Sequence, residues 1–343
     1  MGKKLLALIL AVLLCLGAAG CGGQRSDTPP TTEPTVTTEP TTEPTTEPTT
    51  EPAQETEPAW EGATPLLYKV TDDDGSCIWL LGSIHAGRED FYPLPEYVLS
   101  AYRQSEALAV EVDILAFEKD LVAQLGALKV LVYADGTKIS DHISPELYEQ
   151  TVEILKENKL YNRMMDSYIP AMWSSLVDNV LFTKLDVRAE LGVDRHLLEM
   201  AKADKKPIYE VESAAIQYRM LADFSPELQV MLLESSLASL EDTQGAKDEL
   251  EAMMDLWYTG DEKGLTATLA TQGTPASEEE ARLLLEYNKA MFTDRNLTMA
   301  AYAEQALAED NALFICVGAG HVVGEGAMVE LLRHRGYTVD AVH

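Results

Sequence analysis

Two segments of the chain share one form, in which an apolar run is followed by Gly-x-x-His. The first run leads to Gly82 and His85, and the second leads to Gly318 and His321. In open α/β sheets, ligands bind beyond the carboxyl ends of the strands, so both histidines could face one crevice. A glycine is useful there, because a residue without Cβ lets the chain turn sharply and lets a ligand approach the backbone.

A carboxylate lies in a third apolar run, residues 107–112, at Glu111. Burying an unpaired carboxylate is costly, so we expect Glu111 to have a partner, either a metal ion or an ionised neighbour. Two imidazoles and a carboxylate suit a divalent metal with open coordination positions, which acidifies bound water and polarises a carbonyl oxygen. The structural alternatives are histidines satisfied within the core and a Glu111 paired with arginine or lysine.

Other charged residues are weaker candidates. Arg295 could stabilise an oxyanion or bind a substrate carboxylate, and a structural ion pair is the alternative. Glu212 follows another strand-like run and belongs either to the crevice or to the surface. His196 and Glu199 have the i, i+3 spacing of some metal-binding helices, but the same spacing is common on any polar helix face. The His-Glu-x-x-His, Walker and Gly-x-Ser-x-Gly signatures are absent from the sequence.

The elements that must position these residues alternate between two apolar periods. Runs that read as strands are 66–70, 78–81, 107–112, 207–211, 313–317 and 338–342. Helical stretches are predicted at 95–105, 145–158, 169–185, 193–203, 226–258, 277–292, 294–309 and 322–335. The pattern predicts an α/β fold, with a central mixed sheet flanked by helices. Residues 213–311 show no strand pattern and are expected to form a helical insertion that caps the site.

The N-terminus has the features of a lipoprotein signal peptide over residues 1–20. Lys3 and Lys4 precede an apolar run, 5–16, which is shorter than a membrane-spanning helix requires. Small residues then lead to Cys21, which resembles the acylated cysteine of a bacterial lipobox. We therefore expect a lipid anchor at Cys21 and an extracytoplasmic location on a cell membrane; ordinary secretion with a free cysteine is the alternative.

Residues 21–61 contain the lipidated cysteine and a linker that repeats Thr-Thr-Glu-Pro. With almost no aliphatic side chains, this segment cannot bury enough apolar area to fold, so we expect a disordered spacer. The folded domain is then 62–343, which is long enough for one sizeable core. It also carries most of the formal charge of −31, so binding to nucleic acid or to anionic lipid is disfavoured.

Only two of the four cysteines, Cys77 and Cys316, lie within this domain, so the chain is not a disulfide scaffold. Both occur in apolar runs, where a free cysteine usually behaves as a small buried hydrophobe. A single disulfide or a metal role for the pair is the alternative.

Together the two Gly-x-x-His segments and the Glu111 strand resemble the TraB/GumN family, which includes the pheromone-shutdown proteins and the Tiki proteases. The resemblance extends to three other stretches, 192–198, 206–212 and 294–300, and covers essentially all of 64–343. It implies the fold shared with erythromycin-esterase-like and ChaN-like proteins. The family's paired histidines and strand-end glutamate correspond to His85, His321 and Glu111.

The Tiki members are described as manganese- or cobalt-dependent metalloproteases, so the resemblance implies a manganese or cobalt ion here, with zinc not excluded. The hypothesis is a membrane-tethered, metal-dependent hydrolase acting on peptides. His85 and His321 would bind or flank the metal, and Glu111 would ligate it or act as general base. One alternative is a non-catalytic protein that sequesters a peptide, a metal or haem, and another is a hydrolase of small esters or amides.

Overall fold

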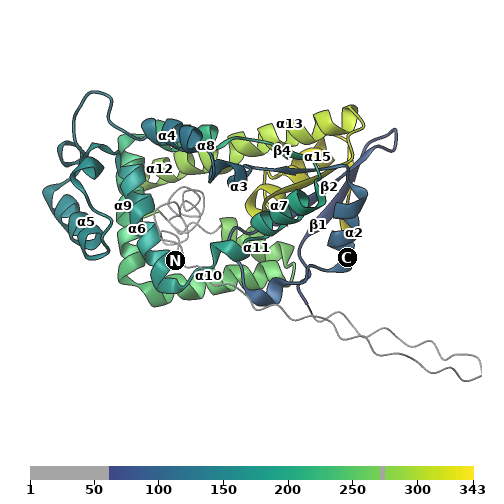
Figure 1. Ribbon diagram of the computed structural model, residues 1–343, viewed down its shortest axis with the longest axis horizontal. Coiled ribbons are helices and arrows are strands. Elements are labelled where there is room, and N and C mark those ends of the chain that lie inside the picture. The colour runs from purple at the N-terminus through teal and green to yellow at the C-terminus, as the bar shows by residue number, and fades with distance from the viewer. Residues whose placement is uncertain (1–61, 271–274) are drawn as a thin grey trace, which may run out of the picture. The chain divides into compact units, whose positions relative to one another are not determined.

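The computed structural model describes residues 62–270 and 275–343 (Figure 1). The predicted signal peptide, Cys21 and the linker lie outside the described residues and stay predictions. None of the described helices is long and apolar enough to cross a membrane.

The described residues form one mixed sheet of six strands in the order β4-β3-β5-β2-β1-β6. The strands are β1 (Leu67–Thr71), β2 (Cys77–Ser83), β3 (Ala107–Val110), β4 (Ile208–Glu210), β5 (Leu313–Gly318) and β6 (Thr338–Val342). Strands β4, β3, β5 and β2 run parallel, whereas β1 is antiparallel to both β2 and β6. The six strand-like runs of the sequence all become strands, and the prediction of a mixed α/β sheet is confirmed.

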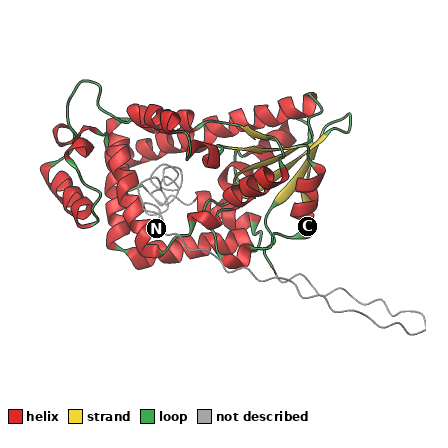
Figure 2. Ribbon diagram, viewed as in Figure 1, coloured by secondary structure: helices red, strands yellow, loops and turns green. Residues whose placement is uncertain are grey.

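The inner parallel strands are buried on both faces. All four residues of β3 are buried, because alternate side chains enter different cores. Leu108 and Val110 join a cluster with Val98 and Leu197, whereas Ala109 joins a second cluster with residues of the C-terminal helices. This double burial explains why β3 and β5 read as continuous apolar runs. Figure 2 shows helices packed around the strands.

The helices of the described residues account for most of the remaining chain. They are α2 (Glu96–Gln104), α3 (Ile114–Phe117), α4 (Leu121–Lys129), α5 (Pro145–Glu157), α6 (Pro170–Leu185), α7 (Val193–Asp204), α8 (Ala214–Asp223), α9 (Pro226–Glu241), α10 (Thr243–Tyr258), α11 (Glu262–Ala270), α12 (Glu278–Asn288), α13 (Asp294–Ala308), α14 (Ala319–Val322) and α15 (Met328–His334). A single π-helical turn, η6 (Lys289–Thr293), joins α12 to α13. Between β4 and β5 the described chain contains only helices and connections, as the sequence pattern predicts.

Two of the predicted helices differ from those observed. The stretch 226–258 is not one helix, because Asp242 ends α9 and caps α10 by accepting a hydrogen bond from the Gly245 N–H. The stretch 322–335 is interrupted after α14, where Gly324 and Gly326 have φ of 118° and 68°. Both conformations are unfavourable for other residues, so the helix restarts only at Met328.

A buried polar seam lies between α6 and α9. The Ser174 and Ser236 hydroxyls lie 2.7 Å apart across the two helices. One helical turn beyond Ser174, Asp178 is fully buried, and neither of its carboxyl oxygens has a hydrogen-bond partner among the described residues. Burial raises the pKa of Asp178 well above its ordinary value of 3.8, although the Ser236 hydroxyl opposes part of that shift.

Cys77 and Cys316 are both free. Cys77 begins β2 opposite Thr71, whereas Cys316 is buried in β5 opposite Leu81. Burial raises the pKa of the Cys316 thiol well above its ordinary range, so this cysteine behaves as a small core residue.

Candidate functional site

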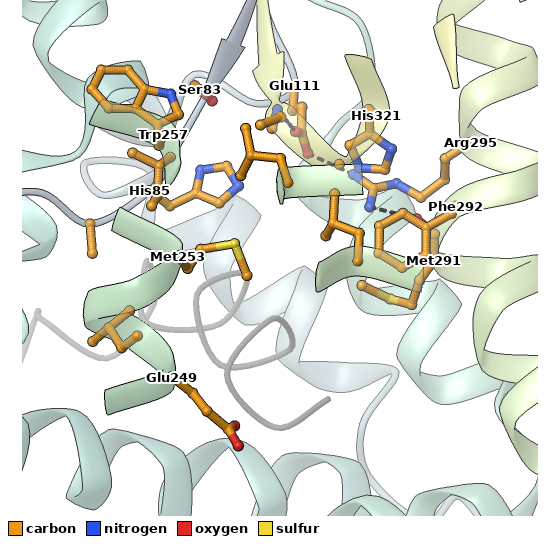
Figure 3. A pocket seen from close by; sticks show the side chains of 18 residues that line it. Ser83, His85, Glu111, Glu249, Met253, Trp257, Met291, Phe292, Arg295 and His321 are labelled. Carbon is orange, nitrogen blue, oxygen red and sulfur yellow. Dashed lines mark hydrogen bonds and ion pairs between the residues drawn. The ribbon is translucent and has the colours of Figure 1, made fainter. Parts of the chain in front are cut away.

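The carboxyl ends of three neighbouring strands carry the predicted site residues. Strand β5 lies between β3 and β2, with Gly318 opposite Ser83 and Cys316 opposite Val110. Because the three strands are parallel, the residues that follow them emerge at the same edge of the sheet. His85, Glu111 and His321 therefore reach one region from segments far apart in the sequence (Figure 3).

Gly318 is the point around which these side chains gather. A Cβ atom added to Gly318 would lie 3.3 Å from Glu111 Oε1, 3.5 Å from His85 Nε2 and 3.8 Å from His321 Cδ2. The absence of a side chain thus opens a small space bounded by all three residues. Gly82 has a different use, because its added Cβ would lie 3.1 Å from the Ala319 Cα, which allows β2 to pack closely against the start of α14.

Glu111 is held by a buried ion-pair cluster. Its Oε2 accepts a hydrogen bond of 2.6 Å from Arg295 Nη2, and its Oε1 accepts one of 2.7 Å from the Gly318 N–H. Arg295 also donates from Nε to Glu212 Oε1 and from Nη2 to Glu212 Oε2, both at 2.8 Å. Gln217 Nε2 bridges the two carboxylates, at 3.3 Å from Glu111 and 3.1 Å from Glu212. The cluster fixes the orientation of Glu111 from both sides.

The electrostatics keep Glu111 ionised. Burial is the largest single influence and raises the pKa of this carboxyl, but the Arg295 guanidinium, the two histidines and the Gly318 N–H together outweigh burial and lower the pKa to about 2. The pKa of Arg295 is raised above its ordinary value, because the two carboxylates outweigh the effect of burial. Arg295 is thus the ion-pair partner of both Glu111 and Glu212.

His85 is oriented by Asp194, which lies in the first turn of α7. The His85 Nδ1 and Asp194 Oδ2 atoms are 2.8 Å apart. The backbone brings these residues together, since the Val193 N–H donates to the Ile84 carbonyl at 2.9 Å. A Cβ at Gly192 would stand 2.5 Å from the His85 carbonyl oxygen, so only glycine allows this approach. Burial lowers the pKa of His85, but Asp194 and then Glu111 outweigh it and raise the pKa to about 9.

His321 is oriented in the same way by an uncharged partner. Its Nδ1 lies 2.7 Å from Asn296 Oδ1, so the Nε2 atom is the free ring nitrogen when Nδ1 carries the proton. The side chain is buried, and burial together with Arg295 lowers the pKa of His321 to about 3. At neutral pH this imidazole is therefore uncharged.

The histidines and Glu111 lie on the floor of a pocket with an empty volume of about 930 Å³, open solvent at its mouth included. Helix α10 forms one wall, and it is attached to the sheet by a hydrogen bond of 2.8 Å from Trp257 Nε1 to the Gly82 carbonyl. Helices α11 and α14 and the π-helical turn η6 supply other lining residues. The helical section thus covers the sheet edge that carries the candidate site, as expected from the sequence.

Some predicted residues do not belong to this pocket. The His196 ring packs against the Tyr92 ring at a tilt of 38°, with centroids 4.3 Å apart, and Glu199 pairs with Arg195 at 3.4 Å. Neither His196 nor Glu199 lines the pocket. Glu212 is buried, but it lies behind Arg295 and contributes no lining atom to the pocket floor.

Sequence reasoning gave no role to three residues that orient the site. Asp194 and Asn296 each bind the inner nitrogen of a histidine, and Gln217 bridges the two glutamates. Asp194 and Asn296 do occur in the short stretches that carry the family resemblance. Gln217 gives no signal of its own, because a glutamine on a helix is ordinarily a surface residue.

The suitability of the site for a metal ion rests on its histidines and its charge. Within 62–270 and 275–343, no group of three or more His, Cys, Asp or Glu side chains is arranged to hold a metal ion. His85 and His321, however, each have the inner ring nitrogen bound by an oxygen, as metal-ligating histidines usually do. The buried carboxylates of Glu111, Glu212 and Asp194 outnumber the two cations beside them, Arg295 and the protonated His85, so the site keeps an excess of negative charge that favours a cation.

The part of the chain that resembles known proteins is nearly the same as the described domain. The model of the TraB/PrgY/gumN family matches residues 66–341. Similar proteins include Uncharacterized protein YbaP of Escherichia coli (strain K12) and the protein of that name from Shigella flexneri. Each is 26% identical over 254 residues, which cover 74% of this chain and 87% of the relative. No solved structure matches the chain.

Proposed function

The chain belongs to the TraB/PrgY/gumN family, and on that basis we propose that it is a metal-dependent hydrolase that cuts amide bonds in peptides. The proposal includes a lipid anchor at Cys21 that holds the domain on the extracytoplasmic side of a membrane. The anchor rests on the sequence of residues 1–21 alone.

The observation that carries the hydrolase proposal is the meeting of His85, Glu111 and His321 around Gly318 at the floor of a pocket. Each of the three side chains is fixed by a separate partner, so little reorganisation is needed when a substrate enters. Preorganised groups of this kind stabilise the charge that develops when water attacks a stable bond.

In this proposal the two histidines hold the metal ion. His85 and His321 would bind it through Nε2, since their Nδ1 atoms are engaged by Asp194 and Asn296. Because the pKa of His85 is raised to about 9, metal binding would release the proton from its Nε2 to the solvent. A divalent cation bound there would acidify a water molecule and polarise the carbonyl oxygen of the substrate. The resemblance to the Tiki proteases favours manganese or cobalt, and zinc also accepts two imidazoles.

Glu111 would act as the general base. Its Oε1 and the His85 Nε2 both border the space at Gly318, where Oε1 would accept the proton of the attacking water. Arg295 would serve to hold Glu111 in place. Its four hydrogen bonds, to Glu111, Glu212 and the Met291 carbonyl, use four of its five N–H donors, which leaves little for an oxyanion.

A direct test combines metal content with peptide turnover. The full chain, purified without chelator, would be compared with His85→Ala and His321→Ala variants by elemental mass spectrometry and by mass spectrometry of a peptide mixture. His334→Ala is a matched control, because His334 is exposed in the last turn of α15. We expect bound metal and turnover in the wild type and the control, and loss of both in the other two variants.

The opposite results would point to the alternatives. A wild type that folds, holds no metal and cuts no peptide would overturn the hydrolase proposal. Haem absorbance on titration would then identify a sequestering protein. Turnover that survives a chelator would show that the protein is a hydrolase without a metal requirement. Turnover of small esters but not of peptides would show that small esters are the substrates.

A further inference from the structure

The pocket above the histidines is lined almost entirely by apolar side chains. Those that form its walls include Met253, Trp257, Leu265, Leu269, Met291 and Phe292. They come from α10, α11 and η6, which are separate elements of the helical section. Three independent elements therefore present apolar groups to one space.

These wall residues differ in burial. Trp257, Leu265 and Met291 are each 1% exposed, so they belong to the cores that support the walls. Met253, Leu269 and Phe292 are only partly buried, although they are large and apolar. Partly buried apolar side chains that face a concave pocket are the usual contact surface for an apolar ligand group.

The three partly buried side chains lie next to the histidines. A Cβ added to Gly320 would lie 3.1 Å from Phe292 Cε1 and 3.4 Å from Leu269 Cδ2, so Phe292 and Leu269 meet over the turn that carries His321. The Phe292 and His321 ring centroids are 5.7 Å apart. Met253 lies on the other side, below His85 in Figure 3. A group bound against these side chains would therefore lie beside a bond held between the histidines.

The charges of the pocket disfavour an anionic group in the same place. The Arg295 guanidinium is neutralised by two buried carboxylates, Glu111 at 2.6 Å and Glu212 at 2.8 Å. Glu249 is a further acidic lining residue, and the whole chain has a formal charge of −31. Against the apolar walls a substrate carboxylate or phosphate would meet repulsion, because the cationic side chains among the described lining residues, Arg295 and His85, are each already paired with a carboxylate.

We propose that the substrate presents a bulky, uncharged apolar side chain or acyl group next to the bond that is cut, and that Met253, Leu269 and Phe292 bind this group. The inference rests on the proposed hydrolase function, because it specifies the substrate class of the same site. Specificity would then come from the helical section, whereas the strand ends supply the reacting groups.

The test uses the full chain and peptides that differ only at one position, which is Leu, Gly, Asp or Lys. Further sets of peptides place this variable residue at each other position in turn. Burial of a leucine side chain should raise kcat/KM for the best Leu peptide roughly 10- to 100-fold over its Gly counterpart. Met253→Gln and Leu269→Gln keep the side-chain size near that of the original and should each reduce this ratio by roughly 3- to 10-fold. Leu285→Gln, which replaces a leucine that is 71% exposed on α12, should leave the ratio unchanged.

The outcomes separate this inference from the function on which it rests. Turnover with no preference for Leu, or with a preference for Asp or Lys, would overturn the inference and leave the hydrolase intact. If no peptide is cut, binding of the same peptides to the His85→Ala variant, measured by calorimetry, decides between the two. If Leu peptides bind more tightly than the others, and this preference weakens in a His85→Ala, Met253→Gln protein, the apolar site is supported without the hydrolase function. If all four peptides bind equally or none binds, both the apolar site and the hydrolase function are overturned.

Discussion

Replacing Asp178 with asparagine should stabilise the protein at neutral pH, and the gain should shrink as the solution is acidified. Asp178 is fully buried on α6, and neither carboxyl oxygen has a hydrogen-bond partner among the described residues. Burial raises its pKa well above 3.8, so the folded protein retains a proton that the unfolded chain releases. The neighbouring Tyr287 stays neutral, because burial raises its pKa above the ordinary value as well.

The sign and size of the effect follow from proton linkage. Between 3.8 and the raised pKa of the folded state, the folded protein binds more protons than the unfolded chain, so stability falls as pH rises. The slope for one such group is about 1.4 kcal/mol per pH unit. Asparagine does not titrate, so the advantage of Asp178→Asn should grow by up to roughly 3 kcal/mol from pH 5 to pH 7.

Urea unfolding of the wild type and the variant at several pH values measures this difference directly. The change in the difference between the two proteins is the informative quantity, since any constant cost of the buried amide cancels. Asp186→Asn, at the exposed C-terminal end of the same helix, is the matched control and should show no such trend. Parallel stability curves for the wild type and Asp178→Asn would refute the reasoning, because they would mean that Asp178 is not held protonated.

Three further predictions follow from the site. Arg295→Gln should destabilise the protein by about 3–5 kcal/mol in urea unfolding, because it leaves two buried carboxylates without a counter-charge. The control Lys202→Met, at a more exposed ion pair, should cost less than about 1 kcal/mol. Equal losses of stability in the two variants would contradict the prediction. Gly192→Ala should cost about 1–3 kcal/mol in thermal unfolding, since its Cβ would overlap a carbonyl oxygen, whereas Gly126→Ala has open space and should not destabilise α4. Asp194→Asn should lower peptide turnover about 10- to 100-fold with the fold intact, because the histidine loses its charged partner; unchanged turnover would show that the contact is structural only.

The strands were the part of the fold that the sequence predicted best. Strands β3 and β5 are buried on both faces, so their runs are uniformly apolar and bounded by polar residues. The helices were harder to predict from the sequence than the strands. The short α4 exposes Leu121, Val122 and Leu125, so it has no amphipathic pattern, and the break at Asp242 depends on one capping side chain.

The site residues could be predicted where a histidine or a glutamate lies at the end of a strand. His85, Glu111 and His321 each follow an apolar run, and the topology brings them together. The role of Arg295 could not be decided from the sequence, since its pairing with Glu111 and Glu212 depends on how α13 crosses the sheet edge. Partners such as Asp194 are fixed by a loop contact between distant segments, which no local pattern encodes.

The position of β5 in the sheet determines how early in synthesis the sheet can form. This strand forms the middle of the sheet between β3 and β2, yet it follows the other parallel strands and the whole helical section in the chain. Until β5 has emerged from the ribosome, β2 and β3 lack the strand that lies between them in the sheet. His321, which follows β5, has then not yet been added to the chain. Such long-range closure makes folding slow and leaves strand edges open meanwhile. The three candidate site residues can therefore come together only after β5 and the turn that follows it have been synthesised.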